Sequence, residues 1–107
     1  MTTGKPQLIT KRKGDTLRLA PKSDLVASTV EAYRASMLKA VEAPGQAVVL
    51  DLSAIEQLDS LGITLVLGLF KSCQKGGVAF SIEGVKPDIV RVFKLFNLTK
   101  FFPVSEA

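Results

Sequence analysis

Strand-like and helix-like patterns alternate along this chain of 107 residues. Residues 47–52 form a continuous apolar run with Asp51 near its end, which is typical of a strand buried on both faces of a sheet. Residues 78–82 predict a second such strand. Two short alternating stretches, residues 7–10 and 16–19, flank Lys13-Gly14-Asp15 and predict a β-hairpin. The chain therefore begins with a hairpin and continues with strands separated by helical segments.

Three segments show helical spacing. Residues 28–42 predict the first helix, because Ser28 and Glu31 have the form of a capping box and Pro44-Gly45 ends the pattern. Residues 59–75 predict the second helix, which Gly76-Gly77 terminates.

The third helix is expected to begin at Pro87, a residue favoured at the first helical position. Ile89, Phe93 and Phe96 share one of its faces, and Asn97 is its expected end. Residues 101–104 predict a last strand at the edge of the sheet, where Pro103 is tolerated.

This order, β-β-α-β-α-β-α with a possible final strand, predicts an α/β fold. Parallel strands connected by helices require right-handed crossovers, so the helices pack on a mixed sheet of four to five strands. We expect a single domain over residues 1–107, with its core at about residues 8–104.

Composition excludes several kinds of chemistry. The chain has no histidine and a single cysteine, Cys73, so one copy cannot build a His/Cys zinc site, a histidine-based triad or a disulfide. We predict no metal, no cofactor and a simple buried role for Cys73. The N-terminus shows no signal peptide, and the uncharged stretch of residues 60–70 is too short to span a bilayer, so a cytoplasmic protein is expected.

The basic side chains are concentrated near the N-terminus. Residues 1–22 carry a net charge of +5, whereas residues 23–107 carry −1. Such a segment can attract nucleic acid or anionic lipid. It has no aromatic side chains to stack on bases, so we interpret it as a solvated hairpin and predict neither nucleic-acid binding nor membrane insertion.

The second predicted helix is apolar around its whole circumference. It is therefore deeply buried or keeps one face for a partner, and Gly62 and Gly68 offer the alternative that it simply packs close to its neighbours. Ser60 is placed to be its N-cap. The free N–H groups and positive dipole at the same position also suit a phosphorylated serine.

Three runs of residues resemble the STAS domain of bacterial anti-sigma factor antagonists: 49–53, 58–63 with its Asp-Ser-Leu-Gly element, and Gly76-Gly77. The similarity extends over roughly residues 8–104 and includes residues 24–28. It implies that Ser60 is phosphorylated by an anti-sigma factor or related serine kinase of the histidine-kinase-like ATPase class. It further implies that the unphosphorylated chain binds this kinase as an anti-sigma factor antagonist, that phosphorylation releases the kinase, and that a metal-dependent serine phosphatase restores binding. The implied partner-binding residues are Asp24, Asp59, Ser60, Leu61, Gly62 and Ile63.

The chain departs from the family pattern in two places. Leu61 stands where many members have a second serine or threonine, and residues 21–23 lack the glycine common before the acidic residue. Thr64, one turn further along, is a weaker candidate phosphate acceptor than Ser60.

Two other functions remain open from the sequence. STAS-like domains also serve as unphosphorylated interaction modules of transport or sensory complexes. An enzyme would need Asp51, Asp59 and Ser60 to cluster at one edge of the sheet. Without histidine, Ser60 lacks its commonest general base, so we predict that the chain is not an enzyme.

Overall fold

A computed structural model describes residues 6–43 and 45–106 of the chain. It contains five strands, three α-helices and one short 3₁₀ helix within these residues. Their bounds in chain order are β1 Leu8–Lys13, β2 Thr16–Pro21, α1 Val30–Ala40, β3 Ala47–Asp51, α2 Ser60–Lys75, β4 Ala79–Val85, α3 Pro87–Leu95, η1 Leu98–Lys100 and β5 Val104–Glu106. The predicted α/β fold and element order are confirmed.

The five strands form one mixed sheet in the order β1-β2-β3-β4-β5. β1 and β2 are antiparallel and joined by a tight turn in which Gly14 has a φ of +60°, so the predicted hairpin is confirmed. The other three pairings are parallel. Because β2, β3 and β4 are parallel, their carboxyl ends lie at the same edge of the sheet.

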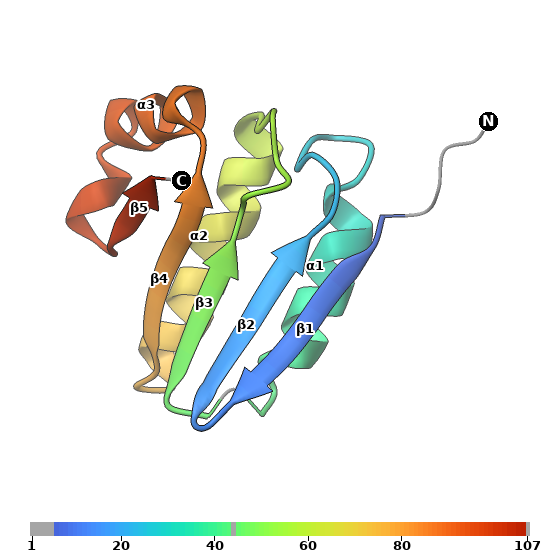
Figure 1. Ribbon diagram of the computed structural model, residues 1–107, viewed down its shortest axis with the longest axis vertical. Helices are drawn as coiled ribbons and strands as arrows, with labels where there is room; N and C mark the ends of the chain where they lie inside the picture. Colours follow the sequence, from blue (N-terminus) through green and yellow to red (C-terminus); the bar gives the residue numbers. More distant parts are fainter. Residues whose placement is uncertain (1–5, 44, 107) are drawn as a thin grey trace.

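The sheet is covered on one face. In Figure 1, α1 and α2 lie behind the strands, while α3 lies at the carboxyl end of β4. Alternation in β3 buries Val48 and Leu50 under the helices and leaves Ala47, Val49 and Asp51 partly exposed on the opposite face. The prediction of a strand buried on both faces is therefore wrong. The apolar run resulted from one buried face and one face of smaller or half-exposed side chains.

The core lies between the sheet and the two helices. Its members are apolar side chains from β2, β3, β4, the three α-helices, η1 and the loops between them, and no polar or charged residue is buried among the described residues. Tyr33 of α1 is the largest of these buried side chains, and its hydroxyl bonds to the Ser23 Oγ at 2.6 Å. Cys73 is buried in α2, as expected, and this burial raises the pKa of its thiol. No helix in the described part of the chain is long and apolar enough to cross a membrane.

The first helix begins later than predicted. Its N-cap is Thr29, not Ser28, and the helix covers residues 30–40 instead of 28–42. Thr29 Oγ1 accepts a bond from the Val26 N–H and donates to the Asp24 carbonyl, so this hydroxyl holds the preceding turn. Glu31 pairs with Arg34 at 2.6 Å, which leaves no capping box. Pro44, part of the predicted helix end, lies outside the described residues.

The last part of the chain also differs from the prediction. Phe96 is exposed, because it follows the last turn of α3 and the chain then reverses at Asn97, which has a φ of +59°. Leu98 is buried after this turn. Phe102 is buried among aromatic rings, and the centre of its ring lies 5.3 Å from the ring centres of both Phe70 and Phe80. Because Phe102 packs in the core, the final strand begins only at Val104 and runs to Glu106. It shares a single residue, Val104, with the strand predicted at residues 101–104.

Candidate functional site

Ser60 is the first residue of α2, and its side chain is exposed. The N-cap of the helix is the residue before it, Asp59, so the prediction of Ser60 as the cap is wrong. Asp59 Oδ1 accepts the N–H groups of Leu61 and Gly62, both at 3.0 Å. A cap must satisfy the second and third N–H groups of the helix, and here the aspartate does so. The Ser60 hydroxyl is thus not needed to cap the helix.

Asp59 also ties α2 to the loop before α1. Its second oxygen, Oδ2, accepts the Ala27 N–H at 2.9 Å. The pKa of Asp59 is lowered mainly by the hydrogen bond from Gly62. Burial, the next largest effect, opposes this lowering, and the bonds from Ala27 and Leu61 add to it. The carboxylate therefore remains ionised beside Ser60 at neutral pH.

Asp24, in the loop before α1, contacts in turn the loop before α2. Its Oδ1 accepts the N–H groups of Glu56 and Gln57, at 2.8 and 3.1 Å. Leu25 then pairs with Leu58 in a short parallel bridge. Asp24 therefore fixes the segment that leads into Ser60. Its role in partner binding stays a prediction.

Gly62 permits the close contact between α2 and the first loop. A Cβ at this position would lie 2.2 Å from the Leu25 carbonyl oxygen and 2.6 Å from Leu58 Cδ1. Gly68 differs, because a Cβ there would meet nothing within 4 Å. The close-packing interpretation of the two glycines is thus right for Gly62 and wrong for Gly68.

The six predicted partner-binding residues differ in exposure. Ser60 and Leu61 are exposed, Leu61 to 45%, and Asp24 and Asp59 are partly exposed. Gly62 and Ile63 are buried and support the first turn of α2 from beneath. The accessible surface around Ser60 is therefore formed by four of the six residues: Asp24, Asp59, Ser60 and Leu61.

Thr64, the other candidate phosphate acceptor, lies one turn along α2. Its Oγ1 donates to the Ser60 carbonyl at 2.9 Å. The hydroxyl of Thr64 is thus engaged with the helix backbone, whereas that of Ser60 projects from the helix start. This difference favours Ser60 as the acceptor.

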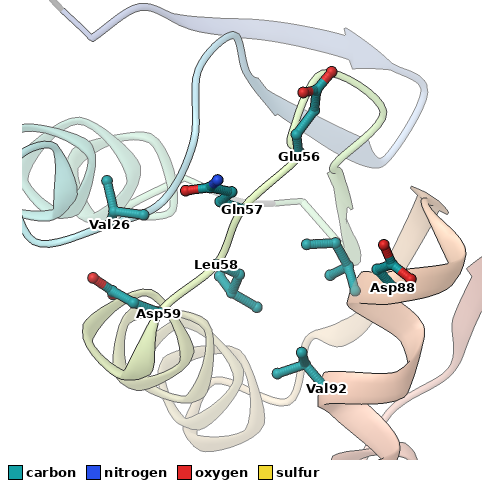
Figure 2. A pocket seen from close by; sticks show the side chains of 8 residues that line it. Val26, Glu56, Gln57, Leu58, Asp59, Asp88 and Val92 are labelled. Atoms are coloured by element: carbon teal, nitrogen blue, oxygen red, sulfur yellow. The ribbon is translucent and has the colours of Figure 1, made fainter.

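An apolar groove lies between the entry to α2 and α3 (Figure 2). Its volume is about 320 Å³, and we call it the α2–α3 groove. Leu58 and Val92 point into it from its two sides, and carboxylates of Asp59 and Asp88 lie at its margin. The residues that line it are Val26, Glu56, Gln57, Leu58, Asp59, Asp88, Ile89 and Val92. The sequence predicted no such groove, because its residues come from loops and a helix with no shared periodicity.

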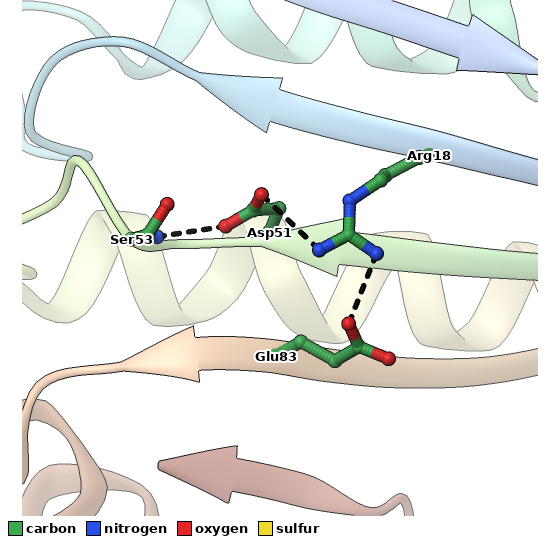
Figure 3. A network of polar contacts seen from close by, with 4 residues as sticks. All are labelled: Arg18, Asp51, Ser53 and Glu83. Carbon is green, nitrogen blue, oxygen red and sulfur yellow. Dashed lines mark hydrogen bonds and ion pairs between the residues drawn. The ribbon is translucent and has the colours of Figure 1, made fainter. Parts of the chain in front are cut away.

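A second polar cluster lies on the uncovered face of the sheet (Figure 3). Arg18 of β2 contacts Asp51 of β3 at 3.2 Å and Glu83 of β4 at 2.9 Å. Asp51 also accepts the Ser53 N–H at 3.0 Å. Burial opposes ionisation of Asp51, but the bonds from Ser53 and Arg18 outweigh it and lower its pKa. Hydrogen bonding to Glu83 is the main reason that the pKa of Arg18 is raised.

The three residues of the hypothetical catalytic cluster have different partners. Asp51 bonds to Arg18 and Ser53, whereas Asp59 bonds to the backbone of α2 and to Ala27. No hydrogen bond joins these two carboxylates to each other or to the Ser60 hydroxyl within residues 6–43 and 45–106. No group of three His, Cys, Asp or Glu side chains in that part of the chain has the arrangement of a metal site.

Comparison with known proteins identifies the family. The STAS domain family matches residues 7–107. The chain belongs to the STAS domain family. Solved structures with the same fold include an anti-sigma factor antagonist from Mycobacterium paratuberculosis, which is 22% identical. That match covers 95% of this chain and 86% of the other, with a TM-score of 0.85.

Two further STAS structures are similar. An anti-sigma-factor antagonist (STAS) domain protein from Planctomyces limnophilus is 18% identical, with a TM-score of 0.81 over 94% of this chain and 90% of that one. The Bacillus cell fate determinant SpoIIAA in its phosphorylated form is 17% identical, with a TM-score of 0.71 over 94% of this chain and 92% of that one. These likenesses establish the fold.

Proposed function

We propose that this chain is an anti-sigma factor antagonist that switches partners through phosphorylation of Ser60. The observation that carries the proposal is the exposed Ser60 hydroxyl on the first residue of α2, next to a cap formed by Asp59. Membership of the STAS family and the likeness to antagonists, one of them in a phosphorylated form, support it. The chain would act in the cytoplasm as a binding protein, not as an enzyme.

The unphosphorylated form would bind its partner through the surface around Ser60. Leu61 is exposed there, and the α2–α3 groove lies alongside with Asp59 at its margin. The proposed partner is an anti-sigma factor or related serine kinase of the histidine-kinase-like ATPase class. Asp24 contributes by fixing the loop that leads into Ser60.

Phosphorylation would remove this partner by electrostatics. A phosphoserine carries a charge of about −1.5 to −2, and here it would stand beside the ionised carboxylate of Asp59. Burying that charge against a partner costs several kcal/mol of complex stability unless a cation pairs with it. The helix N-terminus meanwhile favours an added negative charge, so the free domain stays folded. A metal-dependent serine phosphatase would restore the binding form.

The test is binding of a serine kinase of this class to four forms of the chain by isothermal titration calorimetry. We expect wild type and Ser60→Ala to bind alike and Ser60→Asp to bind at least about tenfold more weakly. Ser72→Asp is the matched control, because it adds the same charge to an exposed position near the other end of α2. It should bind like wild type.

Mass spectrometry after incubation with the kinase and ATP identifies the acceptor. One phosphoryl group on Ser60 and none on Thr64 is the expected result. Equal affinity of Ser60→Asp and wild type would contradict the switch. A chain that binds a transport or sensory complex and never accepts phosphate would instead support the unphosphorylated interaction module.

A further inference from the structure

The end of α3 exposes an unusual amount of apolar surface. Leu95 is 79% exposed, Phe96 53% and Phe101 59%, more than any other large apolar side chain in the described part of the chain. Soluble domains rarely expose several large apolar side chains in one segment without a partner. In Figure 1 this segment, the end of α3 with η1, forms the outer margin of the molecule beyond β4.

The local fold holds these side chains outward. Ile89 and Phe93 occupy the buried face of α3, which leaves Leu95 on another face. The chain reverses at Asn97, and Phe102 anchors the following turn in the core, 6.4 Å from Phe93 between ring centres. The ring of Phe101 packs beside that of Phe70, with 6.1 Å between the ring centres, and much of the Phe101 side chain is exposed to solvent. The exposed side chains therefore stand on a well-packed support.

The charged residues within the segment that carries these side chains are all basic. Residues 89–105 include three basic residues and no acidic residue. Arg91 lies 3.8 Å from Asp88, but both side chains are highly exposed, so this pair is weak. Arg91, Val92, Lys94 and Leu95 border a wide apolar hollow of about 510 Å³. We define the α3–η1 patch as Arg91, Lys94, Leu95, Phe96, Lys100 and Phe101.

We propose that the α3–η1 patch docks this domain on the surface of an anionic lipid bilayer. Exposed leucine and phenylalanine side chains enter the boundary between headgroups and acyl chains, and flanking lysines and arginines meet lipid phosphates. The exclusively basic charge complements an anionic surface. The apolar side chains are exposed at a helix end and a turn, which suits contact with the headgroup boundary of a bilayer. The docking is peripheral.

Docking by this patch does not depend on the proposed phosphorylation switch. Ser60 and Asp59 lie at the start of α2 and are not part of the patch. Ser60→Asp should therefore bind vesicles as wild type does, although it loses the kinase. The two proposals can fail separately.

Fluorescence provides a direct test, because the chain contains no tryptophan. Leu95→Trp introduces a single reporter into the patch, and Leu38→Trp introduces one into α1, where the native leucine is 40% exposed. Vesicles of equal parts phosphatidylglycerol and phosphatidylcholine should shift the emission of Leu95→Trp to the blue. The emission of Leu38→Trp should not shift, and vesicles of phosphatidylcholine alone should change neither.

Co-sedimentation with the same vesicles measures which side chains bind. The double variants L95S/F96S and K94Q/K100Q should each reduce binding at least about tenfold relative to wild type. K11Q/K13Q is the matched control for charge, because it removes two lysines from the exposed strand β1 and should retain wild-type binding. Thermal melting verifies that each variant is folded.

Three results would overturn the proposal. The first is an equal loss of vesicle binding in K11Q/K13Q and K94Q/K100Q. The second is a blue shift of the emission of Leu38→Trp as large as that of Leu95→Trp. The third is that wild type does not bind phosphatidylglycerol vesicles at low salt. The first would indicate general attraction of a basic protein. The last would reassign the patch to a protein partner with an acidic, apolar groove.

Discussion

Asp59 and Ser60 are neighbours in the sequence, but only the aspartate is engaged by the fold. Its carboxylate accepts three backbone N–H groups, from Ala27, Leu61 and Gly62, while the Ser60 side chain is exposed. The structure therefore separates a residue that positions the helix from a residue that is available for modification. A Ser60 that capped α2 would have coupled its phosphorylation to the stability of the helix.

The two residues should consequently differ in their effect on stability. Asp59→Ala removes the cap and the link to Ala27, so we expect the melting temperature to fall by about 5 °C or more. Ser60→Ala should change it by less than about 2 °C, because an exposed side chain at the first helical position is lost. Calorimetry at neutral pH measures both. A larger fall in Ser60→Ala than in Asp59→Ala would contradict the assignment of the cap.

The pH dependence of stability tests the same assignment of Asp59 as an ionised cap. The pKa of Asp59 is lower in the folded chain than in an unfolded one. The stabilisation from its carboxylate is therefore complete above the ordinary pKa of aspartate, about 3.9, and is lost as the pH falls through the lowered value. The difference between wild type and Asp59→Asn should shrink across that acidic range. A difference that grows in acid would be inconsistent with an ionised cap.

Among the elements, α2 contributes most to the site because two constraints coincide at its start. Gly62 allows α2 to approach the Leu25 carbonyl, and Asp24 holds the entry loop through Glu56 and Gln57. The first contact joins the loop after β2 to α2 itself, and the second joins that loop to the loop after β3. The position of Ser60 therefore depends on two loops that meet at one edge of the sheet.

Alanine at the two α2 glycines should have opposite effects. Gly62→Ala forces a Cβ against the Leu25 backbone and should destabilise the domain by about 2 kcal/mol. Gly68→Ala meets open space and improves helix propensity, so it should stabilise by about 0.5–1 kcal/mol. Urea unfolding of the two variants measures the difference. If both variants were destabilised, the open space and the gain in helix propensity inferred at Gly68 would be wrong.

The sequence predicted whole elements better than their ends. Alternation around Leu17 and Leu19 correctly placed β2, and Pro87 correctly began α3. The helix start at Ser28 failed because the Thr29 hydroxyl is used by the preceding turn, a contact that the capping pattern does not encode. Residues 101–104 failed as a strand because Phe102 packs in the core.

The site likewise combines features that sequence patterns encode with contacts that only the fold brings together. Ser60, Asp59 and Asp24 were predicted from a motif and a resemblance. The structure places Asp59 and Ser60 at the start of α2 and Asp24 in the adjoining loop after β2. The Arg18 pair with Asp51 and Glu83 was not predicted, because it requires β3 to lie between β2 and β4 in a particular register. Sequence spacing alone does not contain that order.

At the scale of the whole molecule, the core and the proposed phosphorylation site are physically separate. The buried side chains lie between the sheet and the helices, and no polar residue of the described chain is buried among them. Ser60 stands outside this core at the end of a helix. A charge added there changes the surface presented to a partner and leaves the packing between sheet and helices intact.

We therefore predict that Ser60→Asp changes the domain only locally. Amide resonances should shift in the first turn of α2 and in the loops of Asp24 and Asp59, because these groups lie around the new charge. Those of β1 and of the carboxyl half of α2 should stay in place, as should the melting temperature. Two-dimensional ¹H–¹⁵N spectra of both proteins measure this, with Ser60→Ala as the neutral control. Shifts spread through the sheet would mean that the charge acts through a change of conformation, and occlusion at the contact surface would no longer explain the switch.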